Sequence, residues 1–567
     1  MKYKELAELY EHLSSTTKRL EKTEMLSEFL KKLHESDKEV LYLLLGDIYP
    51  EYSSKKIGIS SQLVIKALSK ASGVPNEHVV KEWKSLGDLG KVAESLMKNK
   101  KQHTLQTHVL TTEKVLENMR KLPELEGKGT VDKKLALIVE LLTSASPIEA
   151  LYLVRTLMGD LRIGIKESTI REAMTKAFYK GEENAAKKVQ DAINKSNDLS
   201  VVFEIVKTGK TSGLGRVKLE IGKPVKVMLA QKASTIKEGF EAVGKPCAVE
   251  YKYDGFRLLI HKKGKEIKLF TRRLEEVTKQ FPEVADSIRK YVKADTAILD
   301  SEAVGYDKKT KAYKPFQAIS QRIKRKYDIE KMQEELPVEI NVFDILYYDG
   351  KSLLDEPFRK RTELVRKIVS PHPLKIVHAK QIITDDEKKA EEFFKQALKN
   401  NQEGVMMKNL DSIYQPGSRV GFMLKVKPQE KDFDLVIVGG EYGTGKRGGW
   451  ISSFILACRE DGKFLEIGKV GTGFKEKKEE GVSFHELTEK IKPLITEEKG
   501  KSVKIKPKIV VSVTYQEIQK SPTYSSGFAL RFPRFTALRP DRNPSDITTL
   551  KEVKADFEKQ KRNWRYG

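Results

Sequence analysis

Cysteine is scarce in this chain: only Cys247 and Cys458 occur among 567 residues. Two thiols exclude a disulfide framework and any zinc site built on several thiolates. The nine histidines show no H-E-x-x-H spacing, which excludes that zinc signature. No apolar run reaches 18 residues, and residues 1–6 lack the apolar core of a signal peptide, so we expect a soluble cytoplasmic protein without a membrane span.

Basic residues outnumber acidic ones. The chain has 106 lysines and arginines against 81 aspartates and glutamates, a formal net charge of +25. This excess favours a polyanionic partner, nucleic acid before an anionic membrane surface, with a basic cytosolic protein of another kind as the alternative. The length exceeds what one hydrophobic core supports, so we expect three or four domains.

The first 215 residues have a helical pattern. Val131 to Leu142 is apolar at helical spacing, and Ser146-Pro147-Ile148-Glu149 combines a cap, a first-turn proline and a capping-box glutamate. Both segments therefore predict helices.

A short glycine pattern occurs twice within this helical region. Leu45-Gly46-Asp47 and Ile57-Gly58-Ile59 are echoed by Met158-Gly159-Asp160 and Ile163-Gly164-Ile165. The repeat suggests two related helical half-units, and coincidence is the alternative. In each unit the glycines would let the backbone approach a partner closely, near basic side chains. Backbone amides at such turns can hold DNA phosphates without reading bases.

Strand signals begin near Pro224. Short apolar or alternating runs occur at Val249–Tyr253, Ile298–Val304, Ile340–Leu346 and Gly404–Met407, with a helical stretch at Asp386–Asn400. After Pro428 we expect nearly all strand: Phe433–Val438, Phe454–Cys458, Phe464–Val470 and Ile509–Ile518, with Asp461-Gly462 as a hairpin turn. The length and pattern fit a small barrel of the oligonucleotide-binding (OB) kind.

A lysine followed by a sharp turn lies in Glu250-Tyr251-Lys252-Tyr253-Asp254-Gly255-Phe256-Arg257. Lys252 ends an apolar run and Asp254-Gly255 turns the chain, which predicts an amine displayed at a strand edge over an adjoining cleft. A lysine amine is a poor nucleophile at neutral pH unless neighbouring cations expose its free form. Taken alone, the pattern favours a surface turn.

The motifs downstream change that weighing. They are Thr271-Arg272-Arg273, Leu299-Asp300-Ser301-Glu302-Ala303-Val304, Val342-Phe343-Asp344-Ile345-Leu346, Glu403-Gly404-Val405-Met406-Met407-Lys408, and Arg419 ahead of Lys425-Val426-Lys427. Nucleotidyl transfer needs such parts: cations on phosphates, carboxylates on a metal, and a platform for the base.

Each motif also has a structural reading. Lys425 and Lys427 are two residues apart in a strand, so both can reach one cleft, although a solvated face is the alternative. Glu302 and Glu403 lie in apolar contexts that demand an ion-pair partner or a metal. Phe343 would ordinarily be a core residue.

In this order the motifs resemble those of the covalent nucleotidyltransferase superfamily, most closely the ATP-dependent DNA ligases of archaea and the eukaryotic replicative type. The resemblance spans nearly the whole chain, including Gly159–Ile165, Gly445-Lys446-Arg447-Gly448-Gly449-Trp450, and Leu530-Arg531-Phe532-Pro533-Arg534-Phe535 with Arg539, Asp541 and Arg542 behind it. It implies a multidomain fold: an all-α N-terminal DNA-binding domain (1–215), an α+β nucleotidyltransferase (adenylation) domain (216–428) and a C-terminal OB-fold β-barrel (429–567).

The resemblance also implies roles for single residues. Lys252 would attack the α-phosphorus of ATP and carry AMP. Glu250 would help to read adenine, Phe343 would stack on it, and Arg257 and Glu302 would hold the ribose side. Phosphates would be neutralised by Arg272, Arg419, Lys425 and Lys427, and Glu302 and Glu403 would place magnesium.

The implied partner is nicked double-stranded DNA, sealed by a monomer during replication, repair and recombination and hence close to the nucleoid. DNA contacts would come from Arg162, Gly164, Lys446, Arg447, Arg531 and Arg534. The final motif would supply arginines to pyrophosphate in the first step, after which the barrel would turn about a mobile connection near Pro428 and grip DNA.

Two departures from the family pattern concern the barrel and the lysine pair. Arg542 stands where a lysine is common, and Phe422-Met423-Leu424 replaces an aromatic that usually precedes the lysines. Gln102-His103-Thr104-Leu105 occupies the place of a sliding-clamp peptide but lacks its paired aromatics, and a solvated loop is the alternative.

Other enzymes share the lysine chemistry. An RNA ligase or an RNA-capping guanylyltransferase is the first rival, and the long helical region ahead of Lys252 speaks against both. An NAD-dependent ligase would bring a four-cysteine zinc module, which two cysteines cannot build. A DNA-binding protein that lost catalysis would not be expected to keep Lys252 and its carboxylates.

Overall fold

The first part of the chain is helical. The computed structural model describes residues 1–53, 55–99, 109–125, 127, 129–323, 327–428, 431–443, 447, 449–474 and 482–565. The helices of this part are α1 (Tyr3–Ser14), α2 (Arg19–Lys32), α3 (Val40–Leu44), α4 (Ser61–Ser72), α5 (Asn76–Leu86), α6 (Leu89–Lys98), α7 (Thr112–Lys121), α8 (Thr130–Ser144), α9 (Pro147–Leu157), α10 (Glu167–Phe178), α11 (Ala185–Ser196) and α12 (Leu199–Lys207). The predicted capping box of α9 is confirmed: Ser146 and Glu149 bond each other's backbone. One apolar core joins these helices.

The two glycine patterns occupy equivalent places, one between α3 and α4 and the other between α9 and α10. Gly46, Gly58, Gly159 and Gly164 all have positive φ, between 60° and 76°. A side chain at Gly46 would contact Leu161, so the two loops lie against each other. The echo in the sequence therefore corresponds to two helix–loop–helix units whose loops meet.

Two sheets form the middle of the chain. The first has the order β1-β11-β10-β2-β9: β1 (Leu229–Ala233), β11 (Arg419–Val426), β10 (Gly404–Asn409), β2 (Cys247–Lys252) and β9 (Gln381–Thr384). The second has the order β4-β3-β5-β6-β7, with β8 beside β6: β4 (Glu266–Thr271), β3 (Phe256–Lys263), β5 (Thr296–Gly305), β6 (Val338–Tyr348), β7 (Lys351–Ser352) and β8 (Ile376–His378). The predicted strands at residues 249, 298, 340 and 404 are all present.

Helices cover the outer faces of the two sheets. Apolar residues of α13 (Ile236–Val243) and α18 (Glu387–Lys399) pack on the first sheet. The second sheet packs with α14 (Pro282–Tyr291), α15 (Phe316–Ile323) and α17 (Phe358–Ile368). The short helix α16 (Ile329–Glu335) precedes β6. A third cluster, which includes Leu259, Ile298 and Met423, joins the facing sides of both sheets. The polar face that remains between the sheets is where the site residues lie.

Lys252 was expected to be displayed where the chain turns after an apolar run, and it is the last residue of β2, immediately before the turn. β2 pairs with β10 on one side and β9 on the other, so it is an interior strand. Lys252 is its last residue, and the amine is accessible because the strand ends there. Sequence periodicity identifies a strand but carries no information on its neighbours.

The C-terminal part is rich in strands. Its main sheet contains β12 (Lys431–Tyr442), β13 (Ile451–Glu460), β14 (Lys463–Val470), β15 (Ile495–Lys499), β16 (Ser502–Ile505), β17 (Val510–Tyr515) and β20 (Arg534–Leu538), while β18 (Glu517–Lys520) pairs with β19 (Phe528–Arg531). Asp461 and Gly462 join β13 to β14 with φ of 48° and 77°, which confirms the predicted hairpin turn.

Two helices contradict the expectation of nearly all strand after Pro428. α19 (Phe484–Ile491) begins at a Ser483 cap and buries Phe484, Leu487 and Ile491 in the barrel core. α20 (Leu550–Arg565) follows the last strand. Helical spacing in α19 spans only two turns, too short to stand out from the surrounding strand pattern.

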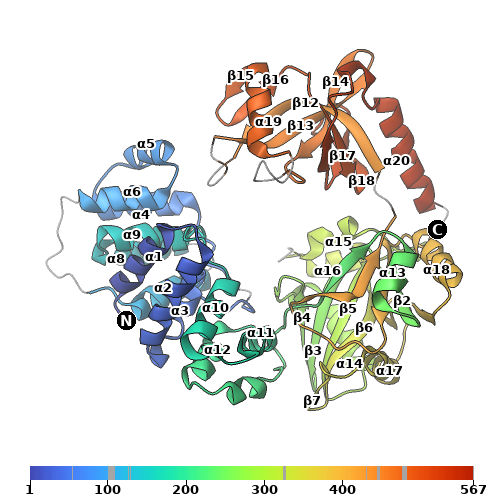
Figure 1. Cartoon of the computed structure of the whole chain (residues 1–567), viewed down its shortest axis with the longest axis horizontal. Coiled ribbons are helices and arrows are strands. Elements are labelled where there is room, and N and C mark those ends of the chain that lie inside the picture. The colour runs from blue at the N-terminus through green and yellow to red at the C-terminus, as the bar shows by residue number, and fades with distance from the viewer. Residues whose placement is uncertain are drawn as a thin grey trace.

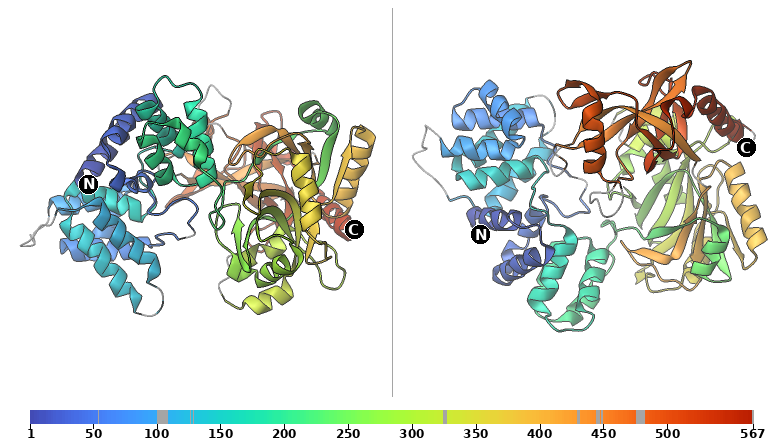
Figure 2. Two further views of the ribbon diagram at one scale, coloured as in Figure 1. Left: turned by 90° about the horizontal axis from the view of Figure 1, so that it is seen from below. Right: turned by 45° about the horizontal axis from the view of Figure 1, so that its top comes forward.

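The three parts are placed around a common centre. Figure 1 shows the helical part on the left, the two sheets at lower right and the strand-rich part above them. Both views of Figure 2 keep the helical part to one side of the other two. In the described part of the chain, no helix combines the length and apolar character needed to cross a bilayer.

Candidate active site

Lys252 lies beside a carboxylate that precedes the neighbouring strand. Its Nζ forms an ion pair with Glu403 Oε2, and Lys427 Nζ lies 2.6 Å from the same oxygen. Burial alone would raise the pKa of Glu403, but these two ammonium groups outweigh it and lower the pKa. The Lys252 side chain is 23% exposed, so its amine is held in place yet open to solvent.

Further cations surround this pair. The pKa of Lys425 is lowered, first by burial and then by the charges of Lys252, Lys427, Arg419 and Arg272. The structure therefore brings together all four residues that the sequence assigned to phosphates, next to the expected nucleophile. Such a concentration of positive charge is stable only because the site is open and Glu403 lies within it.

Arg257 extends from β3 into the space between the sheets. Its Nε lies 2.7 Å from Asp300 Oδ1, and its Nη2 donates to the Tyr414 hydroxyl at 3.1 Å. Burial alone would lower the pKa of Arg257, but the adjacent Asp300 carboxylate raises it. Fixed in this way, the guanidinium is available as a rigid donor on the wall of the site.

Glu302 lies directly across from Arg257 on β5. Desolvation raises the pKa of Glu302 to about 8, and the nearby Glu403 adds to the rise while Lys252 and Arg257 oppose it. Glu302 and Glu403 thus both lie near the charge of Lys252.

Glu250 has both carboxylate oxygens engaged. Lys408 Nζ lies 2.6 Å from Oε2, and Gln381 Nε2 donates to Oε1 at 2.7 Å. The same ammonium lies 4.7 Å from the centre of the Phe343 ring and 4.6 Å from that of Phe358. The predicted base-reading acid and the predicted stacking ring therefore both contact one buried lysine, Lys408.

The turn after Lys252 is tightly packed. A side chain at Gly255 would overlap the Ala303 carbonyl oxygen, so only glycine fits there. Burial, together with the charge of Glu403, raises the pKa of Asp254 to about 6. The Asp254-Gly255 turn is thus built against β5, which fixes the position of the lysine before it.

A cavity of about 720 Å³ lies between the second and third parts of the chain. Asp254, Glu403 and Lys427 line it from the sheets, and Gln516 and Glu517 line it from the strand-rich part. The β17–β18 connection of the strand-rich part thus lies across the cavity from Glu403 and Lys427, the two residues that neighbour Lys252.

The final motif is held within its own part of the chain. Arg539 Nη1 lies 3.0 Å from Asp434 Oδ2 and its Nη2 lies 2.8 Å from Asp541 Oδ2, while Arg542 Nε lies 3.5 Å from Asp434. In this arrangement carboxylates of the strand-rich part already neutralise the motif's arginines.

The loop between α9 and α10 presents Arg162 and Gly164. Arg162 pairs with Asp88 and Asp160. Gly164 has a φ of 66°, and a side chain there would lie 2.7 Å from Lys22 Nζ. The backbone conformation at position 164 therefore favours glycine.

Three of the basic residues predicted on the barrel are described, and their surroundings differ. Arg447 stacks 4.3 Å from the Phe484 ring centre, Arg531 pairs with Glu517 at 3.1 Å, and Arg534 is exposed on β20. Lys446 and the segment Gln102-His103-Thr104-Leu105 lie outside the described residues.

No cluster of three or more histidine, cysteine, aspartate or glutamate side chains with metal-binding geometry occurs in the described ranges. Magnesium commonly uses only one or two carboxylates and takes its other ligands from phosphates and water. Glu302 and Glu403 match that smaller requirement.

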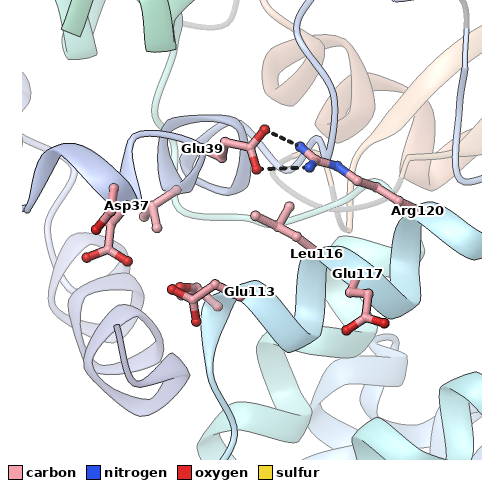
Figure 3. A pocket seen from close by; sticks show the side chains of 9 residues that line it. Asp37, Glu39, Glu113, Leu116, Glu117 and Arg120 are labelled. Carbon is pink, nitrogen blue, oxygen red and sulfur yellow. Dashed lines mark hydrogen bonds and ion pairs between the residues drawn. The ribbon is translucent and has the colours of Figure 1, made fainter. Parts of the chain in front are cut away.

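A separate cavity in the helical part has an acidic lining (Figure 3). It measures about 330 Å³ and is lined by Asp37, Glu39, Glu113 and Glu117, with Arg120 paired to Glu39. Carboxylates repel phosphates, so this cavity is unsuited to a nucleotide or a DNA backbone.

Sequence reasoning missed three residues of the site: Lys408, Gln381 and Tyr414. A signal existed for Lys408, because it ends the motif that begins at Glu403. It lies two residues after Met406, which is opposite Glu250 in the sheet, so its side chain points to the same face as that of Glu250. Gln381 and Tyr414 come from distant segments, and nothing in their local sequence indicates their partners.

Family comparisons cover most of the chain. The model for the DNA ligase N terminus matches residues 2–175, that for the ATP dependent DNA ligase domain matches 227–427, and that for the ATP dependent DNA ligase C terminal region matches 447–542.

Curated relatives match along the full length. The DNA ligase of Nanoarchaeum equitans is 46% identical over 565 residues, and that of Thermococcus onnurineus is 41% identical over 565 residues; each alignment covers 99% of both chains. The solved structure named Pmar-Lig_Pre is 19% identical, covers 94% of this chain and 98% of its own, and superposes with a TM-score of 0.58, which supports the shared fold. This chain belongs to the ATP-dependent DNA ligase family and is an enzyme that seals nicks in DNA at the expense of ATP.

Proposed function

We propose that Lys252 is the nucleophile of this ligase. Its neutral amine would attack the α-phosphorus of ATP, forming a nitrogen–phosphorus bond as the bond to the β-phosphate oxygen breaks and pyrophosphate leaves. The amine attacks in its neutral form, and the ion pair with Glu403 holds it at the end of β2. The observation that carries the proposal is the convergence of Lys252, Glu403 and Lys427 at the end of β2.

Two further transfers complete sealing. The AMP would pass from Lys252 to the 5′-phosphate of a nick, which frees the amine. The 3′-hydroxyl would then attack that phosphate, forming the phosphodiester and expelling AMP.

The nucleotide would lie between the two sheets. Glu250 would accept from adenine and Phe343 would stack on it, because both lie against the same lysine, Lys408, at the first sheet. Arg257 and Glu302, which face each other across β3 and β5, would hold the ribose side.

The phosphates would lie against the cations at the end of β2 and β11. Arg272, Arg419 and Lys427 are close enough to lower the pKa of Lys425, and phosphates would relieve that repulsion. Magnesium, the metal we propose, would be held by Glu302 and Glu403 together with phosphate oxygens and would stabilise charge on the transferring phosphorus.

Duplex DNA would be gripped from both ends of the chain. Arg162 and the Gly164 backbone would contact phosphates from the helical part, and Lys446, Arg447, Arg531 and Arg534 would do so from the barrel. The net charge of +25 supports a steep loss of affinity with salt.

We also propose the working unit and its movement. A monomer divided at 215/216 and 428/429 would enclose the nick, and the barrel would turn about Pro428 so that Arg539 and Arg542 reach pyrophosphate in the first step. Because Asp434 now holds both arginines, that step would require these ion pairs to open. A sliding clamp would bind at Gln102–Leu105.

Labelling with ATP carrying a radioactive α-phosphate tests the nucleophile. With magnesium present, the native chain should retain label after denaturation, and Lys252→Ala should retain none. Lys263→Ala is the matched control, because this exposed lysine ends β3 away from the site and its loss should leave labelling intact. Label on Lys252→Ala would refute the assignment.

A further inference from the structure

The loop between α9 and α10 holds one arginine in an unusual conformation. Arg162 has a φ of 60°, in the left-handed region that arginine rarely adopts. Its Nε lies 2.7 Å from Asp160 Oδ2 and its Nη1 lies 3.2 Å from Asp88 Oδ2. Within the described ranges its Nη2 has no protein partner, which leaves one edge of the guanidinium open to a ligand.

The two carboxylates on Arg162 differ in their surroundings. The Asp88 side chain is 5% exposed, whereas that of Asp160 is 58% exposed. Asp88 also caps α6 by accepting from Gly90 N at 2.8 Å, and it accepts from Arg155 Nη2 at 2.8 Å. One buried carboxylate therefore joins the start of α6, the last turn of α9 and the loop that follows α9.

This junction cannot shift easily. A side chain at Gly90 would lie 2.7 Å from the Leu151 carbonyl oxygen and 2.8 Å from Arg155 Cγ, so α6 begins in direct contact with α9. Close-packed helices transmit the position of one group to another. Asp88 is thus a fixed anchor, while Asp160 is a solvated side chain.

We propose that Asp88 is a positioning residue that aims Arg162 at a DNA phosphate, and that Asp160 competes with that phosphate for the same guanidinium. The inference rests on the proposed contact between Arg162 and DNA. It assigns opposite effects to two carboxylates of equal charge: the buried one strengthens binding to the nick and the exposed one weakens it.

A simpler reading is that Asp88 only stabilises the fold. Asp198 offers a matched control, because it caps α12 with nearly the same backbone conformation, φ −145° and ψ 107° against −149° and 110°, and it is also buried. Removing its charge would disturb a helix cap to a similar degree without touching Arg162.

Equilibrium binding to a nicked duplex that lacks the 3′-hydroxyl, and so cannot be sealed, tests the inference. Asp88→Asn should weaken binding about tenfold, although the loss of a negative charge alone would strengthen it. Asp160→Asn should tighten binding about two- to fivefold at low salt, and less as salt rises. Asp198→Asn should leave the affinity unchanged.

A double-mutant cycle shows whether Asp88 acts through Arg162. In an Arg162→Ala background, Asp88→Asn should no longer change the affinity. If Asp88→Asn binds as tightly as the native chain, or if its effect persists without Arg162, the inference is wrong. Asp160→Asn is exposed and will fold, so a failure of that variant to tighten binding also overturns the inference. If Arg162→Ala alone leaves binding unchanged, the proposed DNA contact itself fails.

Discussion

At the scale of single residues, the active site depends on a balance of charges. Glu403 pairs with two ammonium groups, whereas Glu302 lies a short distance away and is largely protonated at neutral pH because its pKa is about 8. Binding of ATP and magnesium would change that balance, since a metal favours the ionised carboxylate. The empty enzyme therefore keeps a carboxyl group that costs stability when it ionises.

This cost gives a prediction about pH. Because desolvation raises the pKa of Glu302 from 4.5 to about 8, the folded chain binds this proton more tightly than the unfolded chain, and stability falls as pH rises through that window. The free energy of unfolding of Glu302→Gln near pH 9 should therefore exceed that of the native chain by roughly 1–3 kcal/mol, and the variant should unfold at a higher temperature. Near pH 4 the two chains should be equally stable. Thermal unfolding of the nucleotide-free proteins measures this, and equal stability at both pH values would contradict it.

The sequence predicted the residues of the site better than their partners. Lys252, Glu403, Lys425 and Lys427 were predicted because their motifs, in this order, resemble those of the covalent nucleotidyltransferases, and the structure places them close together. The pairing of Lys252 with Glu403 depends on β2 and β10 lying side by side, and 151 residues separate the two. Local pattern carries no information on such contacts, which is also why Gln381 and Tyr414 were missed.

At the scale of elements, the turn between β2 and β3 controls the site. Gly255 packs against the Ala303 carbonyl, so a larger residue must push the turn away from β5 and carry Lys252 with it. The hairpin turn at Gly462 is a contrast, because it has a positive φ of 77° but nothing near the position of a side chain.

Alanine at these two glycines should have different effects. Gly255→Ala should slow adenylation about 100-fold or more, because a misplacement of about 1 Å is enough to lose that much rate. Gly462→Ala should cost about 1 kcal/mol of stability through backbone strain and leave adenylation unchanged. The single-turnover rate of label incorporation and a denaturant titration measure the two effects. Normal adenylation by Gly255→Ala would show that the turn does not hold the lysine in place.

Helices and strands were predicted well where neighbouring residues form a recognisable cap or turn. α9 with its capping box and the β13–β14 hairpin are present as expected, because caps and turns are encoded by adjacent residues. α19 was missed, since two turns of helix between strands give too short a pattern.

At the scale of the whole molecule, one lysine joins the helical part to the sheets. Lys226 Nζ lies 2.8 Å from Glu51 and 2.5 Å from Glu167. These two acids flank the two glycine loops: Glu51 lies between Gly46 and Gly58, and Glu167 follows Gly164. The segment that leads into β1 is therefore bonded to both glycine loops through Lys226.

Loss of the two ion pairs of Lys226, which we call the Lys226 tie, should weaken binding to a nick. Lys226→Met should raise the dissociation constant for a nicked duplex several-fold, corresponding to about 1 kcal/mol, because the loops would no longer be held against the sheets. Lys98→Met removes an equal charge from an ion pair with Glu94 within α6 and serves as the control. If both variants lose affinity equally, the effect is one of net charge and the tie has no role.

The position of a covalent adduct tests the account most directly. The native protein is incubated with ATP and magnesium, digested, and its peptides are sequenced by mass spectrometry. The account predicts one adenylyl group, on Lys252, that disappears when nicked duplex is added. An adenylyl group on Lys425, Lys427 or any other side chain, or none at all in a preparation that seals nicks, would contradict it.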